Sequence, residues 1–179
     1  WSYQYLSLEL ATSISIGTIL SFLTVGGFTQ AIARRGFFYT TQDYYNMARK
    51  IINLFVKFGY VLAFILALVF SAFNAFFQMF PIRMTMVIVL YYFFLTAIWL
   101  SVTVMYILRK ELAFTGLLIV GIILVAVLFY VFKFDIILSQ MVSLVLTSGA
   151  AIILVRRFFA SAEARMETKI EPQLPRLSI

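Results

Sequence analysis

The chain has 179 residues, of which 64% are apolar and only 12% are charged. Soluble globular domains are about 45–50% apolar and about 25% charged, so this composition excludes both a soluble globular domain and a disordered chain. Cysteine and histidine are both absent, which removes thiol nucleophiles, disulfides, cysteine-ligated metals and the commonest general base. We therefore expect a membrane protein that is not an enzyme and that binds no cofactor or metal.

Five apolar runs each approach the roughly 20 residues that a helix needs to cross a hydrocarbon core of about 30 Å. They predict membrane spans at residues 6–28, 54–77, 84–108, 112–132 and 136–155. A closed barrel would need alternating polar and apolar residues, and runs such as residues 61–70 do not alternate. The sequence therefore predicts an all-α polytopic membrane protein whose transmembrane bundle occupies residues 1–160.

Two segments are polar enough to lie outside the bilayer. Residues 29–53 are interpreted as a cytoplasmic segment in which Gly36 breaks the chain direction and a helix starts near Thr41, running into the second span. The tail, residues 161–179, is polar and ends in a proline-containing stretch. It is interpreted as a cytoplasmic linker that is helical to about Met166.

Basic residues are distributed unevenly over the connections between the spans, with twelve on one side and only Arg83 and Lys133 on the other. The twelve are Arg34, Arg35, Arg49, Lys50, Lys57, Arg109, Lys110, Arg156, Arg157, Arg165, Lys169 and Arg176. Cytoplasmic loops carry an excess of Lys and Arg, so this side and the C-terminal tail are predicted to be cytoplasmic and the N-terminus external. The same bias accounts for the net charge of +7 without a nucleic-acid partner. An external start at Trp1 without a signal peptide suggests a preceding span.

Small residues recur every four positions in two of the spans. They are Gly59, Ala63, Ala67, Ser71 and Ala75 in the second span, and Ser139, Ser143 and Thr147 in the fifth. Small residues at this spacing let helix backbones approach closely in lipid. The pattern predicts faces for helix packing, and a sliding or gating face of a moving transporter is the alternative interpretation.

Four polar residues lie inside or beside the outer halves of the spans: Glu9, Asn74, Arg83 and Gln140. Ionisable and polar groups within a membrane are candidates for a functional site, so these four are predicted to line a substrate pathway. Snorkelling to the outer interface is the alternative for Glu9. Trp99 and its aromatic neighbours in the third span are suited either to stacking on sugar rings or to packing and lipid contact.

The order of the spans, taken with four short stretches, resembles a known family of exporters. The stretches are residues 11–13 (ATS), 27–34 (GFTQAIAR), 92–100 (YFFLTAIWL) and 106–110 (YILRK). Together they resemble the PelG family of exopolysaccharide exporters, within the multidrug/oligosaccharidyl-lipid/polysaccharide (MOP) flippase superfamily. The resemblance covers about residues 6–160.

This resemblance implies a fold of two six-helix lobes, in which the five spans form most of one lobe as the second to sixth of twelve. It implies export of polysaccharide or lipid-linked oligosaccharide across the bacterial inner membrane. The implied partners are the lipid bilayer, the remainder of the protein (a first span and a second lobe), a cytoplasmic glycosyltransferase and other membrane proteins of an export complex. A cation-coupled small-solute transporter of the same superfamily and a non-transporting membrane scaffold or sensor domain remain alternatives.

Overall fold

A computed structural model describes residues 7–170 of the chain, with side chains as far as residue 162. The described residues form five helices and no strand: α1 (Leu8–Thr41), α2 (Tyr45–Phe77), α3 (Ile82–Ile107), α4 (Glu111–Tyr130) and α5 (Ile136–Ile170). Each helix is long and apolar enough to cross a membrane. The predicted all-α, five-span architecture is thus confirmed, and the chain is a multi-pass membrane protein.

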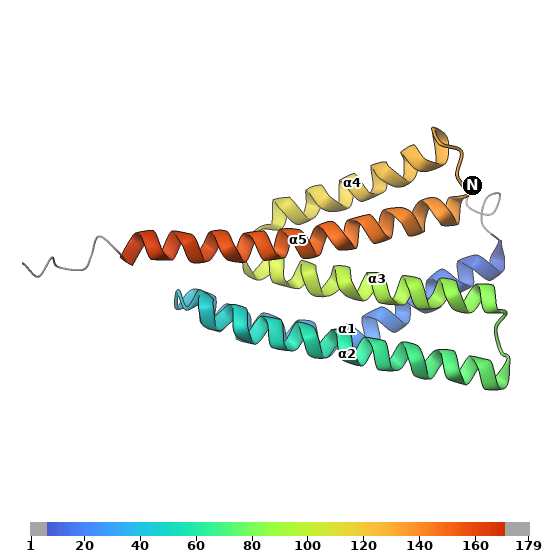
Figure 1. The fold of residues 1–179 in the computed structure, drawn as a ribbon, viewed down its shortest axis with the longest axis horizontal. Coiled ribbons are helices and arrows are strands. Elements are labelled where there is room, and N and C mark those ends of the chain that lie inside the picture. Colours follow the sequence, from blue (N-terminus) through green and yellow to red (C-terminus); the bar gives the residue numbers. More distant parts are fainter. Residues whose placement is uncertain (1–6, 171–179) are drawn as a thin grey trace, which may run out of the picture.

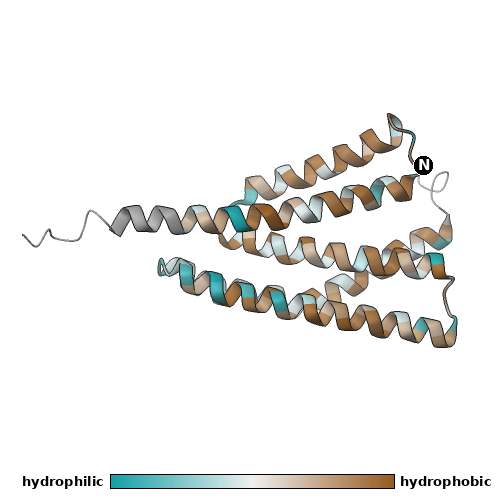
Figure 2. Ribbon diagram, viewed as in Figure 1, coloured by the Kyte–Doolittle hydropathy of each residue, from teal (hydrophilic) through white to brown (hydrophobic). Residues whose placement is uncertain are grey.

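Consecutive helices run in opposite directions (Figure 1), so the connections gather at two ends of the bundle. One end holds the turn between α1 and α2 at residues 42–44, the turn between α3 and α4 at residues 108–110, and the last turns of α5. We call it the basic end, because nearly all lysines and arginines of the described residues lie toward it, and we call the opposite end the far end. Figure 2 shows hydrophobic residues along the middle of the helices and hydrophilic residues toward the basic ends of α2 and α5.

Three helices are longer than a bilayer requires. α1, α2 and α5 have 34, 33 and 35 residues, or about 50 Å each at a rise of about 1.5 Å per residue. The hydrocarbon core is only about 30 Å thick. At the basic end α1, α2 and α5 extend past the ends of α3 and α4 (Figure 1), so much of the predicted cytoplasmic segment 29–53 consists of helix that continues out of the span.

The prediction of a break at Gly36 is wrong, because α1 continues through it to Thr41. A Cβ atom at Gly36 would lie 2.6 Å from Cδ1 of Ile107 and 3.2 Å from Cδ1 of Ile52. The glycine therefore serves a close approach of α1 to α3 rather than a change of direction. The actual reversal follows Thr41, where Asp43 adopts a left-handed φ of 63°, a conformation that aspartate tolerates better than most residues.

The ends of α2 and α5 also differ from the predicted ones. α2 begins at Tyr45, a turn later than the expected start near Thr41. α5 continues to Ile170, beyond Met166 and through the first half of the predicted linker. Residues 1–6 and 171–179, which include the start of the first predicted span and the end of the linker, lie outside the described residues.

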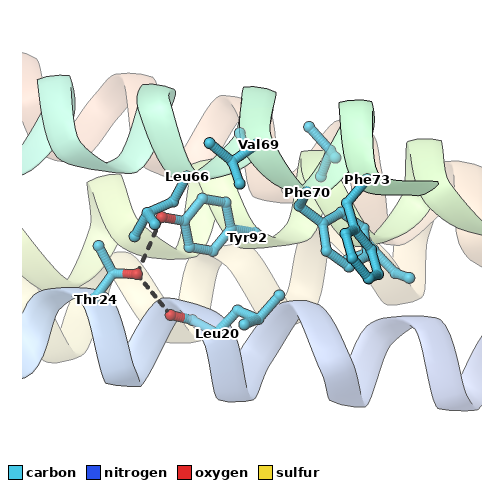
Figure 3. Close-up of a pocket in the computed structure, with 10 residues that line it drawn as sticks. Leu20, Thr24, Leu66, Val69, Phe70, Phe73 and Tyr92 are labelled. Carbon is cyan, nitrogen blue, oxygen red and sulfur yellow. Dashed lines mark hydrogen bonds between the residues drawn. The ribbon is translucent and has the colours of Figure 1, made fainter. Parts of the chain in front are cut away.

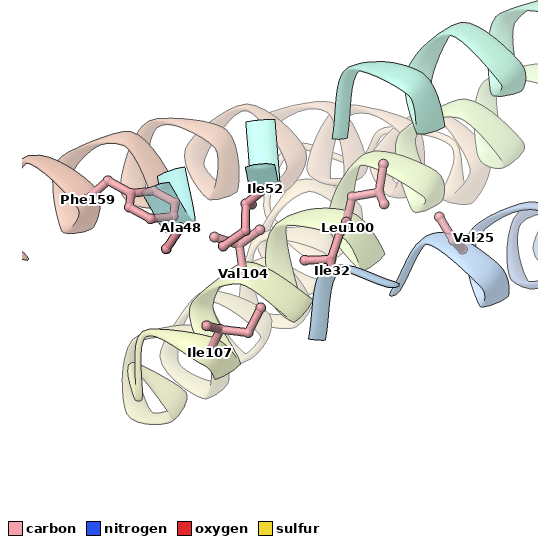
Figure 4. Close-up of a cluster of buried hydrophobic side chains, with 8 residues drawn as sticks. All are labelled: Val25, Ile32, Ala48, Ile52, Leu100, Val104, Ile107 and Phe159. Carbon is pink, nitrogen blue, oxygen red and sulfur yellow. The ribbon is translucent and has the colours of Figure 1, made fainter. Parts of the chain in front are cut away.

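α3 occupies the centre of the bundle and packs against each of the other four helices. The main apolar cluster joins four helices in the half of the bundle toward the basic end (Figure 4). Its members are Val25, Ile32, Ala48, Ile52, Leu100, Val104, Ile107 and Phe159. Because α1, α2 and α5 contribute to this cluster beside the last turns of α3, side-chain packing holds the helix extensions together where they leave the span.

Candidate functional site

The four predicted pathway residues all lie toward the far end, but they have different environments. Glu9 is exposed on the first turn of α1 and Arg83 is exposed on the first turn of α3. Asn74 is buried near the end of α2, and Gln140 is half-buried on the first turns of α5. Their shared level in the bundle therefore does not by itself place them in one site.

Asn74 closes the turn between α2 and α3. Its Nδ2 atom donates to the carbonyl oxygen of Phe80 at 2.9 Å and to Oγ1 of Thr85 at 2.7 Å. Its Oδ1 atom accepts from the Phe80 amide at 2.8 Å. A side-chain amide has two N–H donors, and both are used here, so Asn74 has no donor left for a ligand.

Gln140 connects two helices. The hydroxyl of Tyr91 on α3 donates to Oε1 of Gln140 on α5. Hydrogen bonds between helices inside a membrane are a common means of fixing their relative positions. Gln140 thus contributes to the α3–α5 interface in the far half of the bundle.

The small residues of α2 are buried only over part of the predicted stripe. Gly59, Ala63 and Ala67 are buried, Ser71 is half-buried and Ala75 is exposed. At Gly59 a Cβ atom would lie 3.1 Å from Cδ1 of Leu100, which shows that α2 and α3 approach closely there. Four residues advance a helix by about 400°, so a four-residue stripe rotates away from the interface along its length.

On α5, Ser139, Ser143 and Thr147 are all buried. The hydroxyl of Ser143 donates to the carbonyl oxygen of Gly121 on α4 at 2.7 Å. A Cβ atom at Gly121 would lie 2.8 Å from Oγ1 of Thr147. Ser143, Thr147 and Gly121 thus form a close contact between α4 and α5, whereas the Ser139 hydroxyl donates to the carbonyl oxygen of Asp135 at 3.0 Å.

An apolar cavity of about 280 Å³ lies between α1, α2 and α3 (Figure 3). Its polar atoms are already engaged: the Thr24 hydroxyl donates to the carbonyl oxygen of Leu20 at 2.9 Å and lies 3.0 Å from the Tyr92 hydroxyl. Because the Thr24 hydrogen points to Leu20, Tyr92 donates to Thr24. The remaining wall includes Leu66 and Phe70, so this cavity offers little for specific recognition of a polar ligand.

A more polar cavity of about 320 Å³ lies between α1, α3 and α4, in the half of the bundle toward the basic end. We call it the aromatic pocket. Its lining includes four aromatic residues, two threonines and one glutamate: Phe22, Trp99, Tyr106, Phe114, Thr29, Thr103 and Glu111. The hydroxyls of Thr29 and Thr103 donate to carbonyl oxygens of their own helices, so they are left as acceptors. α4 packs mainly against α5, and it contributes Glu111 and Phe114 to the pocket.

Trp99 is the central side chain of the aromatic pocket. Its ring centroid lies 4.6 Å from that of Phe22. Its Nε1 atom is buried and has no hydrogen-bond partner among the described residues. A buried donor without a partner costs about 1–3 kcal/mol, so this side chain sits in an energetically unfavourable position within the packed bundle. The carboxylate of Glu111 lines the same pocket from the first turn of α4.

Sequence reasoning identified Trp99 as a possible sugar-stacking residue but did not identify the rest of the pocket. Trp99, Thr103 and Tyr106 have the spacing of one face of a helix, and this signal indicates the α3 wall. Thr29 and Glu111 come from two other helices, and only the packing of α1 and α4 against α3 brings them to this wall.

Among the described residues, no group of three or more histidine, cysteine, aspartate or glutamate side chains could hold a metal ion. No protein-family model matches the chain, and it is similar to no curated protein and no solved structure. The functional assignment therefore depends on the geometry of the aromatic pocket and on the pattern of the sequence.

Proposed function

We propose that the chain is a membrane-embedded part of a transporter that exports polysaccharide or lipid-linked oligosaccharide across the bacterial inner membrane. The observation that carries this proposal is the aromatic pocket between α1, α3 and α4. A sugar ring has an apolar face and a rim of hydroxyls, so it fits a pocket that combines aromatic surface with a few hydrogen-bonding groups. Trp99 supplies aromatic surface beside Phe22, and Glu111 supplies an acceptor for sugar hydroxyls.

The size and position of the pocket favour a short stretch of a longer saccharide. Its volume of about 320 Å³ is near the lower limit of ligand pockets, which hold about 300–1,000 Å³. A pocket of this size holds only a short part of a polymer, so the rest of a growing chain extends beyond it. In the proposed complex a first span and a second lobe complete the pathway, and a cytoplasmic glycosyltransferase delivers the saccharide.

The proposed direction of export places the basic end in the cytoplasm. Lys and Arg residues are enriched on the cytoplasmic side of membrane proteins. The basic end holds Arg109 and Lys110 in the turn between α3 and α4, and the other described basic residues of that side lie in the adjoining ends of α1, α2 and α5. A cysteine scan checks this directly, because the chain has no native cysteine. Met79→Cys at the exposed far end should react with a membrane-impermeant maleimide in intact cells, and Asn46→Cys at the basic end should react only after permeabilisation. The reverse pattern would contradict the proposed orientation.

Saccharide binding can be followed with Trp99 as the reporter. The chain has two tryptophans, so Trp1→Phe leaves Trp99 as the only one. In detergent or nanodiscs, soluble oligosaccharides of hexoses and hexosamines should change its fluorescence in a saturable manner. Glu111→Gln should weaken this binding about tenfold or more, because hydrogen bonds to a charged group contribute about 1.5–3 kcal/mol.

The matched control is Asp135→Asn, which removes an exposed carboxylate directly before α5 at the far end. It should leave the affinity unchanged. If no oligosaccharide in the panel gives a saturable change, or if the two carboxylate variants bind alike, the aromatic pocket is not a saccharide site.

A further inference from the structure

A second large cavity, of about 500 Å³, lies between α2, α3 and α5 in the half of the bundle toward the basic end. We call it the basic groove. Two of its cations, Lys57 on α2 and Arg156 on α5, come from different helices. Arg49, about two turns before Lys57 on α2, is a third lining residue. No aspartate or glutamate is among the described lining residues, so the groove carries a local excess of positive charge.

Below these cations the lining is mainly apolar, with Tyr60 and Ser101 as polar members. Its floor is formed by α3 through Leu100 and Val104, and its α5 wall includes Val155. Phe159 is buried where α5 meets Ala48 and Ile52 of α2 (Figure 4). This contact closes the groove toward the basic end.

The position of the cations relative to the apolar spans indicates how deep in the membrane the groove lies. The apolar run that contains Lys57 begins at residue 54, and the run of α5 ends at residue 155, directly before Arg156. Both cations are therefore at the level where lipid headgroups lie, whereas the floor around Leu100 extends into the hydrocarbon region. A ligand that fills the groove must be anionic at one end and apolar at the other.

We propose that the basic groove binds an anionic glycerophospholipid, with the headgroup phosphate between Lys57 and Arg156 and an acyl chain along the α3 floor. Phosphate oxygens accept charge-assisted hydrogen bonds from lysine and arginine. Basic pockets between transmembrane helices bind lipid headgroups for this reason. The inference goes beyond saccharide export and holds whatever the chain transports, because it concerns a different cavity whose cations lie on α2 and α5.

Lipid binding in the groove can be distinguished from general attraction of anionic lipids to the charged surface of the basic end. Lys50 and Arg157 are exposed at the same end and do not line the groove. Each is within seven residues of a groove cation on the same helix, so it feels nearly the same membrane surface. Lipid bound in the groove depends on Lys57 and Arg156, whereas lipid held by surface charge alone depends equally on all four.

The test compares two double variants of the full chain. The purified protein is exchanged into nanodiscs that contain phosphatidylglycerol at a low fraction in phosphatidylcholine, and bound phosphatidylglycerol is quantified by native mass spectrometry after release. Lys57→Gln with Arg156→Gln should reduce its apparent affinity about tenfold or more. Lys50→Gln with Arg157→Gln should change it less than about twofold. Equal losses in the two double variants would overturn the proposal.

Two further arms identify the ligand and exclude misfolding. Ser101→Leu keeps every cation but fills part of the groove floor, and it should reduce phosphatidylglycerol binding while the helical content stays that of the wild type. Lys57→Arg with Arg156→Lys keeps both charges and should bind phosphatidylglycerol nearly as well as the wild type, so a loss there would contradict a charge-based site.

Inorganic phosphate at millimolar concentration should not displace the lipid. Displacement by phosphate alone would show that the groove is a free-anion site and would overturn the lipid assignment.

Discussion

α3 and α4 are neighbours in sequence and are both strongly apolar, yet the structure uses them in opposite ways. In the most apolar stretch of α3, 56% of the residues are buried inside the bundle, against 6% in that of α4, although α4 is the more apolar of the two. Gly121 is the one buried residue of α4. Apolar character therefore does not decide which helix is central.

Apolar character does not select the central helix because the helices are surrounded by lipid rather than by water. Lipid tails are as apolar as leucine side chains, so helices in a bilayer gain little from burying apolar surface against one another. α3 is instead held by close backbone contacts and by polar side chains such as Tyr91, Thr85 and Tyr92. α4 has few such groups, and the bond from Ser143 is a polar link between it and α5. The central helix is the one whose polar side chains bond to several neighbouring segments, namely α1, α2 and α5.

The largest expected difference between the two helices comes from truncating an apolar side chain on each. Met105 on α3 is 0% exposed, whereas Ile122 on α4 is 71% exposed. Met105→Ala should lower the free energy of unfolding by about 2–3 kcal/mol through lost packing. Ile122→Ala should change it by less than about 0.5 kcal/mol. Unfolding in mixed micelles with increasing SDS measures both, and equal losses would mean that α4 is packed against protein.

A smaller but sharper effect is expected where α1 touches α3. A Cβ atom at Gly17 would lie 2.8 Å from the carbonyl oxygen of Ile88, a backbone atom that cannot rotate away. Gly17→Ala should therefore destabilise the protein by about 1–3 kcal/mol. Gly27, on the same helix, has no atom within 4 Å of its Cβ position, and Gly27→Ala should stabilise it by up to about 1 kcal/mol. The same SDS titration shows whether the two glycine variants shift stability in opposite directions.

Asn74→Ala tests the turn between α2 and α3. The change leaves Phe80 and Thr85 without the three hydrogen bonds to the Asn74 amide, which should cost about 2 kcal/mol. Ser71→Ala, one turn earlier on α2, removes only a bond within its own helix, to the carbonyl oxygen of Ala67, and should cost less than about 0.5 kcal/mol. If both variants unfold at the same SDS fraction, the Asn74 amide does not hold the turn.

The smallest effect is expected from the bond between α4 and α5. Ser143→Ala removes the donor to Gly121, and hydrogen bonds between helices in membranes contribute about 0.6 kcal/mol on average. Hydrogen exchange of the Gly121 region should increase while that of α3 stays unchanged. Increased exchange throughout α3 would show that α4 supports the centre of the bundle and would contradict its peripheral position.

The five spans could be predicted from the sequence because each is a long apolar run, but the helix ends could not. Hydropathy decreases where basic residues begin, whereas α1, α2 and α5 continue because Ile32, Ile52 and Phe159 pack together there. Gly36 was predicted as a break, and a glycine that fits against Ile107 cannot be distinguished from a helix breaker without the neighbouring helix.

The candidate sites were less predictable than the fold. The partners of Asn74 and Gln140 lie on another helix or turn, so their packing roles depend on tertiary contacts. Likewise, Glu111 reaches the wall around Trp99 only through the positions of α1 and α4. The sequence assigned the basic residues to membrane orientation, and the convergence of Lys57 and Arg156 on one groove is a property of the packed bundle.

The opposite roles of α3 and α4 can be measured most directly by lipid accessibility. Single cysteines placed one at a time along residues 91–101 of α3 and 117–127 of α4 carry a nitroxide label, and collisions with oxygen dissolved in the bilayer report contact with lipid. We expect strong collisions along α4 with a minimum near Gly121, and weak collisions at most positions of α3, in line with the buried fractions of 6% and 56% in their most apolar stretches. Protection of α4 as complete as that of α3 would contradict its peripheral position, because it would mean that protein, rather than lipid, covers this helix.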